Sequence, residues 1–410
     1  MKTILKQTTW LIVAQVLTKA VGFFYTIFLA KNLGVSDFGL FTVALAYFSI
    51  ISSIADFGFN RFLVREVVRN ELKTSELLCN VVMLRLVLTS ILFAVFAIFL
   101  YSLDPDKIRV SLILLAVLAI LPQSVALTFD SIFVAFRKLQ FSAVALLLSS
   151  LLTTLAGLFL VTSGFGVMGA INALIFGQLI FAATLIILLY GKFGLLLSNI
   201  KLSIIKKAII GSLPYGLLGV LGLLYFRIDA VLLSYLRGSF ETGLYGIAYR
   251  FLEAIVFVPG AFAVALFPKM AKLHDDNLAE VKKLYFKALK LMAVLGMAVM
   301  FGYLFILPLA IKLFLPQFLQ SIDVIKILFL SIPFIFLATP GVQLLLSTEK
   351  YLTEVIVLST FTVVLNILLN LLFIPQFGFS AAAWITVLSD ALSFVIFFLL
   401  IKYQILDRKN

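Results

Sequence analysis

The chain has 410 residues, of which 63% are hydrophobic and only 12% are charged, and its formal net charge is +13. A soluble domain is usually about 45–50% apolar and about 25% charged, so this composition indicates a membrane protein with many spans and excludes a soluble enzyme. One cysteine, Cys79, excludes an intramolecular disulfide, and no zinc, redox or nucleotide motif occurs in the chain. We therefore expect no cofactor, no metal site and no nucleic-acid partner.

Twelve apolar stretches follow one another along the chain. A helix that crosses a membrane needs about 20 apolar residues. The candidate spans lie at roughly 9–32, 37–60, 77–101, 109–136, 141–163, 167–191, 208–236, 243–270, 286–308, 323–347, 351–374 and 378–401. The sequence thus predicts an all-α integral membrane protein with twelve transmembrane helices.

The positive charges provide a test of that number. Cytoplasmic segments of membrane proteins carry an excess of Lys and Arg. With the N-terminus in the cytoplasm, most of the chain's 32 lysines and arginines fall on the inner side, and the outer segments hold only Lys31, Lys107, Arg109, Arg237, Lys312 and Lys326. Because a miscounted span would remove this asymmetry, we expect a multi-pass protein of the cell membrane with both termini in the cytoplasm.

Two of the inner linkers, 61–78 and 269–286, alternate basic and apolar residues at helical spacing. Such segments lie in the headgroup layer, where Lys and Arg meet anionic lipids, or they serve only to set the topology. The sequence leaves both alternatives open.

An internal repeat divides the chain into halves. The pattern G-x-x-D-x-G-L-F at 34–41 recurs as G-x-x-E-x-G-L-Y at 238–245, 204 positions later. The Phe-Gly pair at 165–166 recurs at 377–378, and prolines stand at 122 and 333. Six spans in each half place both copies in the same orientation, which is typical of parallel repeats that enclose a substrate site. We expect two pseudo-symmetric six-helix lobes, 1–200 and 201–410, around a central cavity.

Short motifs recur in a fixed order from end to end of the chain. The N-terminal half has Leu33-Gly34, Phe38-Gly39, Asp56-Phe57-Gly58 and Arg65-Glu66. The C-terminal half has Pro214-Tyr215, Arg227-x-Asp229, Gly243-x-Tyr245-x-x-Ala248-x-Arg250, Phe267-Pro268-x-Met270, Asn366 with Asn370, and Ile374-Pro375-x-Phe377-Gly378. In this order they resemble the oligosaccharide-lipid flippases of the polysaccharide transporter family. That family belongs to the superfamily of multidrug, oligosaccharidyl-lipid and polysaccharide exporters.

The resemblance implies a non-enzymatic transporter. Its cargo would be a polyprenyl-diphosphate-linked oligosaccharide, moved from the cytoplasmic to the outer leaflet by alternating access. Membrane lipids, and polymerase and chain-length proteins of the same pathway, are the implied partners. The product would be the O-antigen of lipopolysaccharide, a capsule, an exopolysaccharide or a glycoprotein glycan. Relatives that flip the peptidoglycan precursor usually carry two extra helices, which this sequence does not show.

Four cations lie inside predicted spans: Lys19, Arg85, Arg227 and Arg250. Charges at membrane depth are costly and usually face a bundle interior, and arginine matches the oxygens of a diphosphate. We expect these four to form a cationic cavity for the cargo. Arg250 has an alternative, because Glu253 is three residues away and can pair with it.

Carboxylates and amides inside spans are further candidates. An intramembrane carboxylate can carry a coupling ion, and Asp390, near the middle of its span, is the first choice, with Asp130 the second. Asn366 and Asn370 share one helix face, and Asn172 and Gln178 lie in the corresponding region of the first half. These amides contact the sugar or bond between helices.

Two other functions compete with flipping. A cation-coupled multidrug exporter of the same superfamily would prefer an acidic, aromatic cavity for its cationic cargo, and the four intramembrane cations argue against it. A membrane-embedded polymerase or glycosyltransferase usually needs a large outer loop, and the outer loops here are short.

Overall fold

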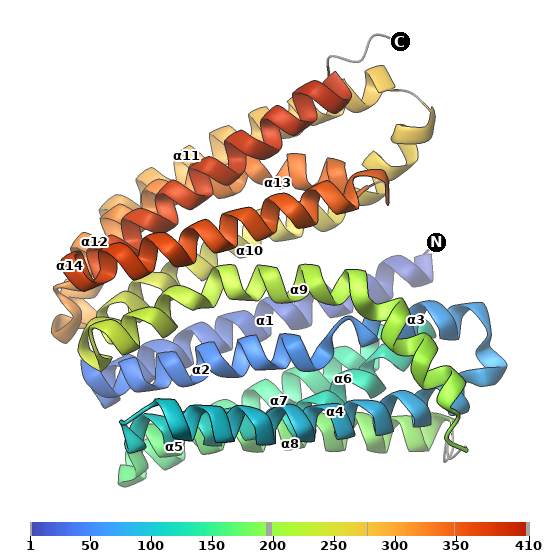
Figure 1. Cartoon of the computed structure of the whole chain (residues 1–410), viewed down its shortest axis with the longest axis horizontal. Helices are drawn as coiled ribbons and strands as arrows, with labels where there is room; N and C mark the ends of the chain where they lie inside the picture. Colours follow the sequence, from blue (N-terminus) through green and yellow to red (C-terminus); the bar gives the residue numbers. More distant parts are fainter. Residues whose placement is uncertain (1, 194–198, 277, 348, 407–410) are drawn as a thin grey trace. The chain divides into compact units, whose positions relative to one another are not determined.

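The computed structural model describes residues 2–193, 199–276, 278–347 and 349–406, and the regular elements in these ranges are all helices (Figure 1). An apolar chain in lipid must satisfy its backbone hydrogen bonds within each segment, and the helix does so. The first part of the chain forms α1 (Lys2–Leu33), α2 (Val35–Asp56), α3 (Phe59–Arg69), α4 (Thr74–Leu103), α5 (Lys107–Leu118), α6 (Ile120–Ala135), α7 (Leu139–Leu160) and α8 (Gly166–Phe193).

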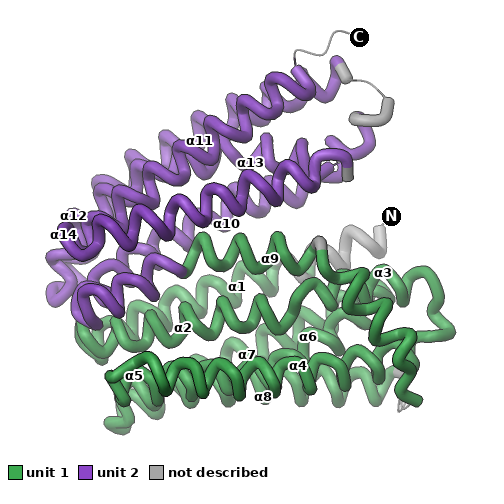
Figure 2. Tube along the Cα trace, viewed as in Figure 1, with its two compact units in different colours: residues 1–227 green, residues 228–410 purple. Residues whose placement is uncertain are grey.

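The second part forms α9 (Leu202–Leu236), α10 (Ser239–Asp276), α11 (Leu278–Phe314), α12 (Ser321–Leu328), α13 (Ile332–Leu346) and α14 (Leu352–Ile401). Short 3₁₀ or π turns lie at Glu71–Lys73, Val161–Phe165, Pro316–Phe318, Phe329–Ser331, Glu349–Tyr351 and Lys402–Leu406. The chain divides into two compact units, Met1–Arg227 and Ile228–Asn410, so that α9 begins in one and ends in the other (Figure 2).

Large apolar side chains from several helices form the core of the first unit. Phe59, Phe62 and Leu63 of α3 pack with Leu84 of α4 and Phe133 of α6. This core fixes α3 at the end of α2, although the two helices are separated by a sharp break. In the second unit the largest fully buried side chains are Tyr245, Tyr285, Phe318, Phe329 and Phe336.

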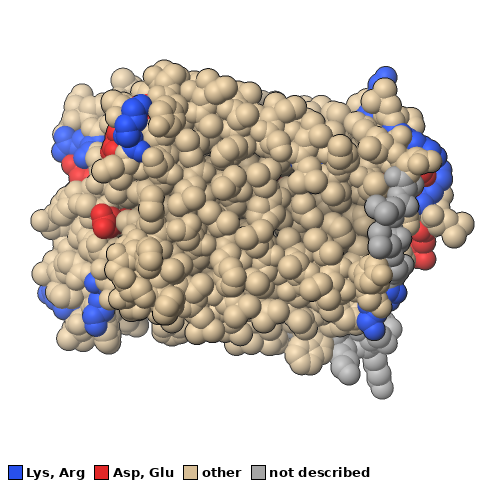
Figure 3. Space-filling model, turned by 90° about the horizontal axis from the view of Figure 1, so that it is seen from below, with Lys and Arg blue, Asp and Glu red and all other residues tan. Residues whose placement is uncertain are grey.

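Ten helical stretches of the described chain are long and apolar enough to cross a membrane. In the face that Figure 3 shows, charged side chains gather toward the two ends and the broad surface between them is formed by other residues. Two of the ten stretches, Leu139–Lys192 and Leu352–Leu406, have 54 and 55 residues. Both contain a break with non-helical backbone, at Gly164 and at Gly378. The all-α membrane fold is confirmed, and the number twelve stays a prediction.

The repeat recurs in the backbone geometry. Gly34 and Gly238, which precede the second helix of each half, have φ values of 78° and 86°. Gly166 has φ 52° and ψ −137°, and Gly378 has φ 58° and ψ −145°. Only glycine adopts such angles without strain. The same unusual conformation at matched positions supports an internal repeat.

Candidate functional site

A buried carboxylate is the centre of a polar cluster in the second unit. Asp229, near the end of α9, is 2% exposed. Its Oδ1 accepts a hydrogen bond from Asn370 Nδ2 at 2.8 Å. Its Oδ2 accepts from Tyr245 Oη at 2.9 Å and from Thr386 Oγ1 at 2.8 Å. Helices α9, α10 and α14 therefore meet at one side chain.

The two asparagines of α14 extend this cluster. They are four residues apart, so they share one helix face, as the sequence predicts. Asn366 is 1% exposed and Asn370 is fully buried. Asn370 Nδ2 also approaches Asn366 Oδ1 at 3.1 Å, and Asn366 Nδ2 donates to Ser389 Oγ at 3.3 Å. Their amides bond to groups of the protein, across helices as well as along α14.

The hydrogen-bond partners of Asp229 within the described chain are all neutral. A carboxylate buried among neutral groups is costly in its charged form. Oxygen atoms surround Asp229, and small hard cations prefer oxygen ligands. One of these atoms, Asn370 Oδ1, is buried and has no hydrogen-bond donor in the described chain. The described residues hold no group of three or more His, Cys, Asp or Glu side chains for a metal. A carboxylate with oxygen atoms of this kind around it can bind a monovalent cation or a proton.

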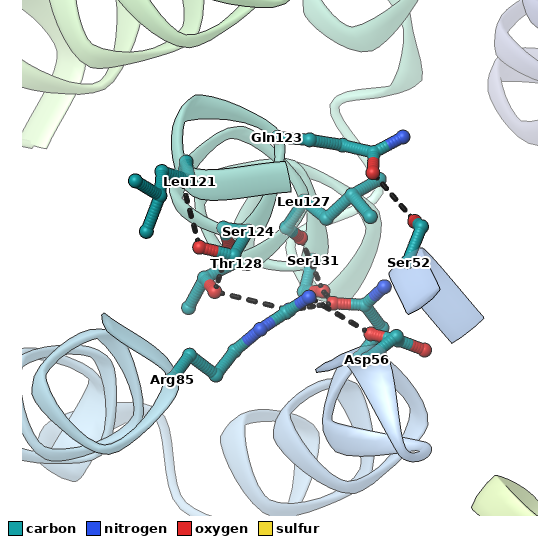
Figure 4. Close-up of polar contacts among 10 residues, drawn as sticks. Ser52, Asp56, Arg85, Leu121, Gln123, Ser124, Leu127, Thr128 and Ser131 are labelled. Carbon is teal, nitrogen blue, oxygen red and sulfur yellow. Dashed lines mark hydrogen bonds and ion pairs between the residues drawn. The ribbon is translucent and has the colours of Figure 1, made fainter. Parts of the chain in front are cut away.

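A second polar network, in the first unit, surrounds Arg85 of α4 (Figure 4). This arginine is 1% exposed. Its Nη1 donates to Asn60 Oδ1 at 2.6 Å and to Thr128 Oγ1 at 3.1 Å. Its Nη2 lies 3.1 Å from Asp56 Oδ1. Arg85 thus ties together the end of α2, the start of α3, and α6, with its charge balanced by Asp56.

The network stabilises a break in the chain. Between α2 and α3, Phe57 and Gly58 are both left-handed, with φ 41° and 81°. A Cβ at Gly58 would lie 2.6 Å from the carbonyl oxygen of Ser212. Glycine at this position lets α9 approach the break backbone to backbone, which larger residues would prevent.

The other candidate residues are placed as follows. Arg250 Nη1 donates to Glu253 Oε2 at 3.0 Å, which is the pair that helical spacing offers as the alternative to cargo binding. Arg227 of α9 is half-buried, Lys19 of α1 is exposed, and Asp390 of α14 is 7% exposed. Asp130 of α6 faces Ser142 of α7. Asn172 is exposed and Gln178 is half-buried, and neither belongs to the Asp229 cluster.

Sequence reasoning missed the central role of Asp229 and the hydrogen bond that Tyr245 donates to it. A signal for both was present. Asp229 lies nine residues before Gly238 and Tyr245 seven residues after it. At 1.5 Å per residue, two antiparallel helices joined at this turn place the two side chains at nearly equal depth. Asn370 lies eight residues before Gly378 and Thr386 eight residues after it, so the same argument places these two side chains at nearly equal depth.

Comparison with known proteins agrees with this fold. Residues 4–274, more than half of the chain, match the model of a family described as "Polysaccharide biosynthesis protein". A curated protein of Haloferax volcanii, "Probable flippase AglR", is 26% identical over 273 residues, which are 63% of this chain and 54% of that protein. The alignment thus spans about half of the relative's length.

Solved structures of exporters share the architecture. An inward-facing multidrug resistance MATE family transporter of the MOP superfamily gives a TM-score of 0.73 at 16% identity, covering 95% of this chain and 94% of that one. The lipid II flippase MurJ in an inward closed conformation also gives 0.73 at 16% identity, covering 96% and 87%. A MOP superfamily transporter from Pyrococcus furiosus gives 0.67 at 16% identity, covering 98% and 95%. At these identities the likeness shows the fold alone. The family match shows more, and the chain belongs to the family of polysaccharide biosynthesis proteins.

Proposed function

We propose that this protein is a flippase that moves a polyprenyl-diphosphate-linked oligosaccharide from the cytoplasmic to the outer leaflet of the cell membrane. The observation that carries the proposal is the family match over residues 4–274, joined by a relative that is itself named as a flippase. The lobes 1–200 and 201–410 would rock to alternate access, with both termini in the cytoplasm. Transport of this kind makes and breaks no covalent bond, so the protein is a transporter and no enzyme.

The diphosphate is the part of this cargo that needs the protein most. Two phosphate charges in a medium of low dielectric require cations, and arginine provides a planar fork for phosphate oxygens. Arg227, which lies within the span Tyr215–Leu236, is the first choice for this contact. Lys19 is the second, and Arg250 would contribute if the cargo displaced Glu253. Arg85, which bonds to Asp56 and Asn60, acts instead on the structure of the first unit.

The Asp229 cluster would couple transport to a cation gradient. Its donor set of carboxylate, amide and hydroxyl oxygens suits Na⁺, and a proton on Asp229 is the alternative. Asp390 and Asp130 remain further carboxylates for this role. The sugar would contact other polar groups, such as Gln178 and Asn172, since Asn366 and Asn370 are engaged with Asp229 and with each other.

A sided transport assay tests the proposal. Proteoliposomes carry a labelled polyprenyl-diphosphate oligosaccharide in the outer leaflet, and the label that becomes protected measures flipping. Wild type and the surface control Lys326→Ala should flip at equal rates, and Arg227→Ala should lose most of the activity. Multidrug export is the second candidate, favoured by the MATE-like fold. A wild-type protein that moves a lipophilic cation and no lipid-linked sugar would replace the flippase proposal with it.

A further inference from the structure

Helix α3 has two chemically different faces. Its buried side is formed by Phe59, Phe62, Leu63, Glu66 and Val67, which pack into the core of the first unit. Its other side carries three arginines at helical spacing: Arg61, Arg65 and Arg69. The helix ends the apolar stretch Val35–Arg69, so these cations lie at the end of a candidate span.

One carboxylate holds several of these cations in place. Glu66 accepts an ion-paired hydrogen bond from Lys207 of α9. The nearest guanidinium nitrogens of Arg65 and Arg69 lie 3.6 and 3.7 Å from Glu66 Oε1, which is beyond good hydrogen-bond length. Three cations thus face a single carboxylate, and the group has a net positive charge. Arg65 Nε is buried with no hydrogen-bond acceptor in the described part of the chain.

Helix α9 makes this array rigid. A Cβ at Gly211 would lie 2.8 Å from the Phe62 ring and 3.3 Å from Arg65 Nη2, so the glycine allows close contact with α3. The guanidinium carbon of Arg61 lies 5.6 Å from the centre of the Tyr215 ring. The cations are therefore mounted on two packed helices, seen together at the right of Figure 1, and not on a loop. A preorganised array of this kind loses little entropy when it binds an anion.

Exposed apolar side chains surround the cations. Val68 and Leu72 are 57% and 98% exposed, and Ile209 and Ile210 of α9 are 42% and 63% exposed. A site for soluble phosphate needs no exposed apolar side chains beside it. A lipid can contact such side chains with its acyl chain while its headgroup contacts the cations.

We propose that Arg65, Arg69 and Lys207, held around Glu66 on α3 and α9, form a binding site for the phosphate headgroup of a membrane lipid. A guanidinium group can donate two parallel hydrogen bonds to two oxygens of one phosphate. Arg65 and Arg69 have N–H donors for this, because Glu66 does not use all of them. The site is distinct from the Asp229 cluster and from Arg227, and it does not depend on which cargo the protein transports. Positive charge at this end of the span predicts the cytoplasmic leaflet.

Native mass spectrometry of the full-length protein in neutral detergent tests the site. Dioleoyl phosphatidylglycerol and dioleoyl phosphatidylcholine are titrated separately, and the dissociation constant of the first bound lipid is measured. Each basic residue near an anionic lipid contributes about 1 kcal/mol, which lowers the dissociation constant of that lipid about fivefold. Wild type should prefer phosphatidylglycerol by about tenfold or more, and Arg65→Gln/Arg69→Gln should remove the preference. Sodium chloride at high concentration should also remove it, since salt screens exposed charges.

The matched control is Lys312→Gln/Lys326→Gln, which removes the same charge from two exposed residues outside the predicted inner linkers. This variant should keep the wild-type preference, and an equal loss would show that only the net charge matters and overturn the site. Inorganic phosphate that competes with the lipid at equal concentration would overturn the lipid assignment. If wild type still prefers phosphatidylglycerol at high salt, this result alone overturns the proposal.

Discussion

At the scale of single residues, the protein places ionisable groups at membrane depth and handles the two best-defined ones differently. Arg85 has a carboxylate partner, Asp56, at 3.1 Å. Asp229 has neutral hydrogen-bond donors in Asn370, Tyr245 and Thr386. A paired charge is stable in one state, whereas a carboxylate among neutral groups becomes more stable when a cation binds. The first group is therefore structural, and the second is suited to a binding step.

Asp229→Asn should abolish the response of the protein to Na⁺. The amide keeps the shape of the side chain and removes the charge that a cation needs. A ligand that binds only the folded state stabilises it, by about 1.4 kcal/mol at a tenfold excess over its dissociation constant. Thermal unfolding in NaCl and in choline chloride measures this effect. We expect Na⁺ to raise the unfolding temperature of wild type and of Asp390→Asn, and to leave Asp229→Asn unchanged.

A response that disappears in Asp390→Asn and remains in Asp229→Asn would move the coupling site to Asp390. If Na⁺ does not change the unfolding temperature of wild type and gradient-driven transport still requires Asp229, the coupling ion is a proton.

Arg85→Met should destabilise the first unit strongly. The variant leaves the Asp56 carboxylate without its arginine. Removing one partner of a fully buried ion pair usually costs about 3–5 kcal/mol, and the cost here is smaller because Asp56 is 28% exposed. The double variant Arg85→Met/Asp56→Asn removes both charges and should recover much of the loss. Denaturant titration of the detergent-solubilised protein measures all three. If the double variant is no more stable than the single one, the ion pair is not what holds the α2–α3 break.

At the scale of elements, the breaks at Gly166 and Gly378 turn the chain back on itself in each half. In the second half the break has an additional contact. Glu241, in the first turn of α10, accepts a hydrogen bond from the backbone N–H of Phe379 at 2.9 Å and pairs with Arg237 at 2.8 Å. The turn between α9 and α10 is thus attached to the break in α14.

Replacing each of these glycines by alanine should have unequal effects. Both variants place a Cβ in a backbone region that costs of order 1–3 kcal/mol for residues other than glycine. At Gly166 the new Cβ meets nothing within 4 Å, whereas at Gly378 it would lie 2.2 Å from Glu241 Oε2. Gly378→Ala should therefore lose the Glu241 hydrogen bond as well, about 1–2 kcal/mol more. Unfolding free energies of the two variants give the difference, and equal values would contradict a role for the Glu241 contact.

The elements themselves were predictable from the sequence, and the polar cluster was not. Hydropathy and charge asymmetry identify the spans, and the gaps between the predicted spans at 163–167 and 374–378 lie where the structure has its breaks. The pairing of Arg250 with Glu253 follows from helical spacing. Contacts between helices depend on rotation and depth, which apolar periodicity defines poorly. For that reason Asp229 and Thr386, 157 residues apart in the sequence, were not joined before the structure showed their hydrogen bond.

At the scale of the whole molecule, the two halves share a backbone plan and differ in polar content. Three of the five buried residues of α7 recur as buried residues of α14 at an offset of 213, and these pair Ser142 with Val355, Ser149 with Thr362 and Gly157 with Asn370. Tyr25 corresponds to Asp229 at the offset of 204 set by Gly34 and Gly238. The Tyr25 hydroxyl fills the space beside Gly157, where a Cβ would lie 1.9 Å from it. The first half therefore has a ring where the second has a carboxylate and an amide, so the cation site proposed at Asp229 has no counterpart at these positions of the first half.

The number of membrane crossings gives the last prediction. A helix of 54 or 55 residues would extend about 80 Å at 1.5 Å per residue, more than twice the hydrocarbon thickness of about 30 Å. We therefore predict that Leu139–Lys192 and Leu352–Leu406 each cross twice, with their breaks at an aqueous surface. Phe165 and Phe377, beside the breaks, are 59% and 62% exposed.

Cysteine labelling can place these breaks, because Cys79 is the one native cysteine. In a Cys79→Ser background, single cysteines replace Phe165, Phe377, Phe240 or Leu72, and intact cells are treated with a membrane-impermeant maleimide. Twelve crossings with a cytoplasmic N-terminus require labelling of the first three from outside and of Leu72→Cys only after the membrane is opened. If Phe165→Cys and Phe377→Cys resist labelling from both sides, the two breaks lie inside the bilayer and the prediction of twelve crossings is wrong.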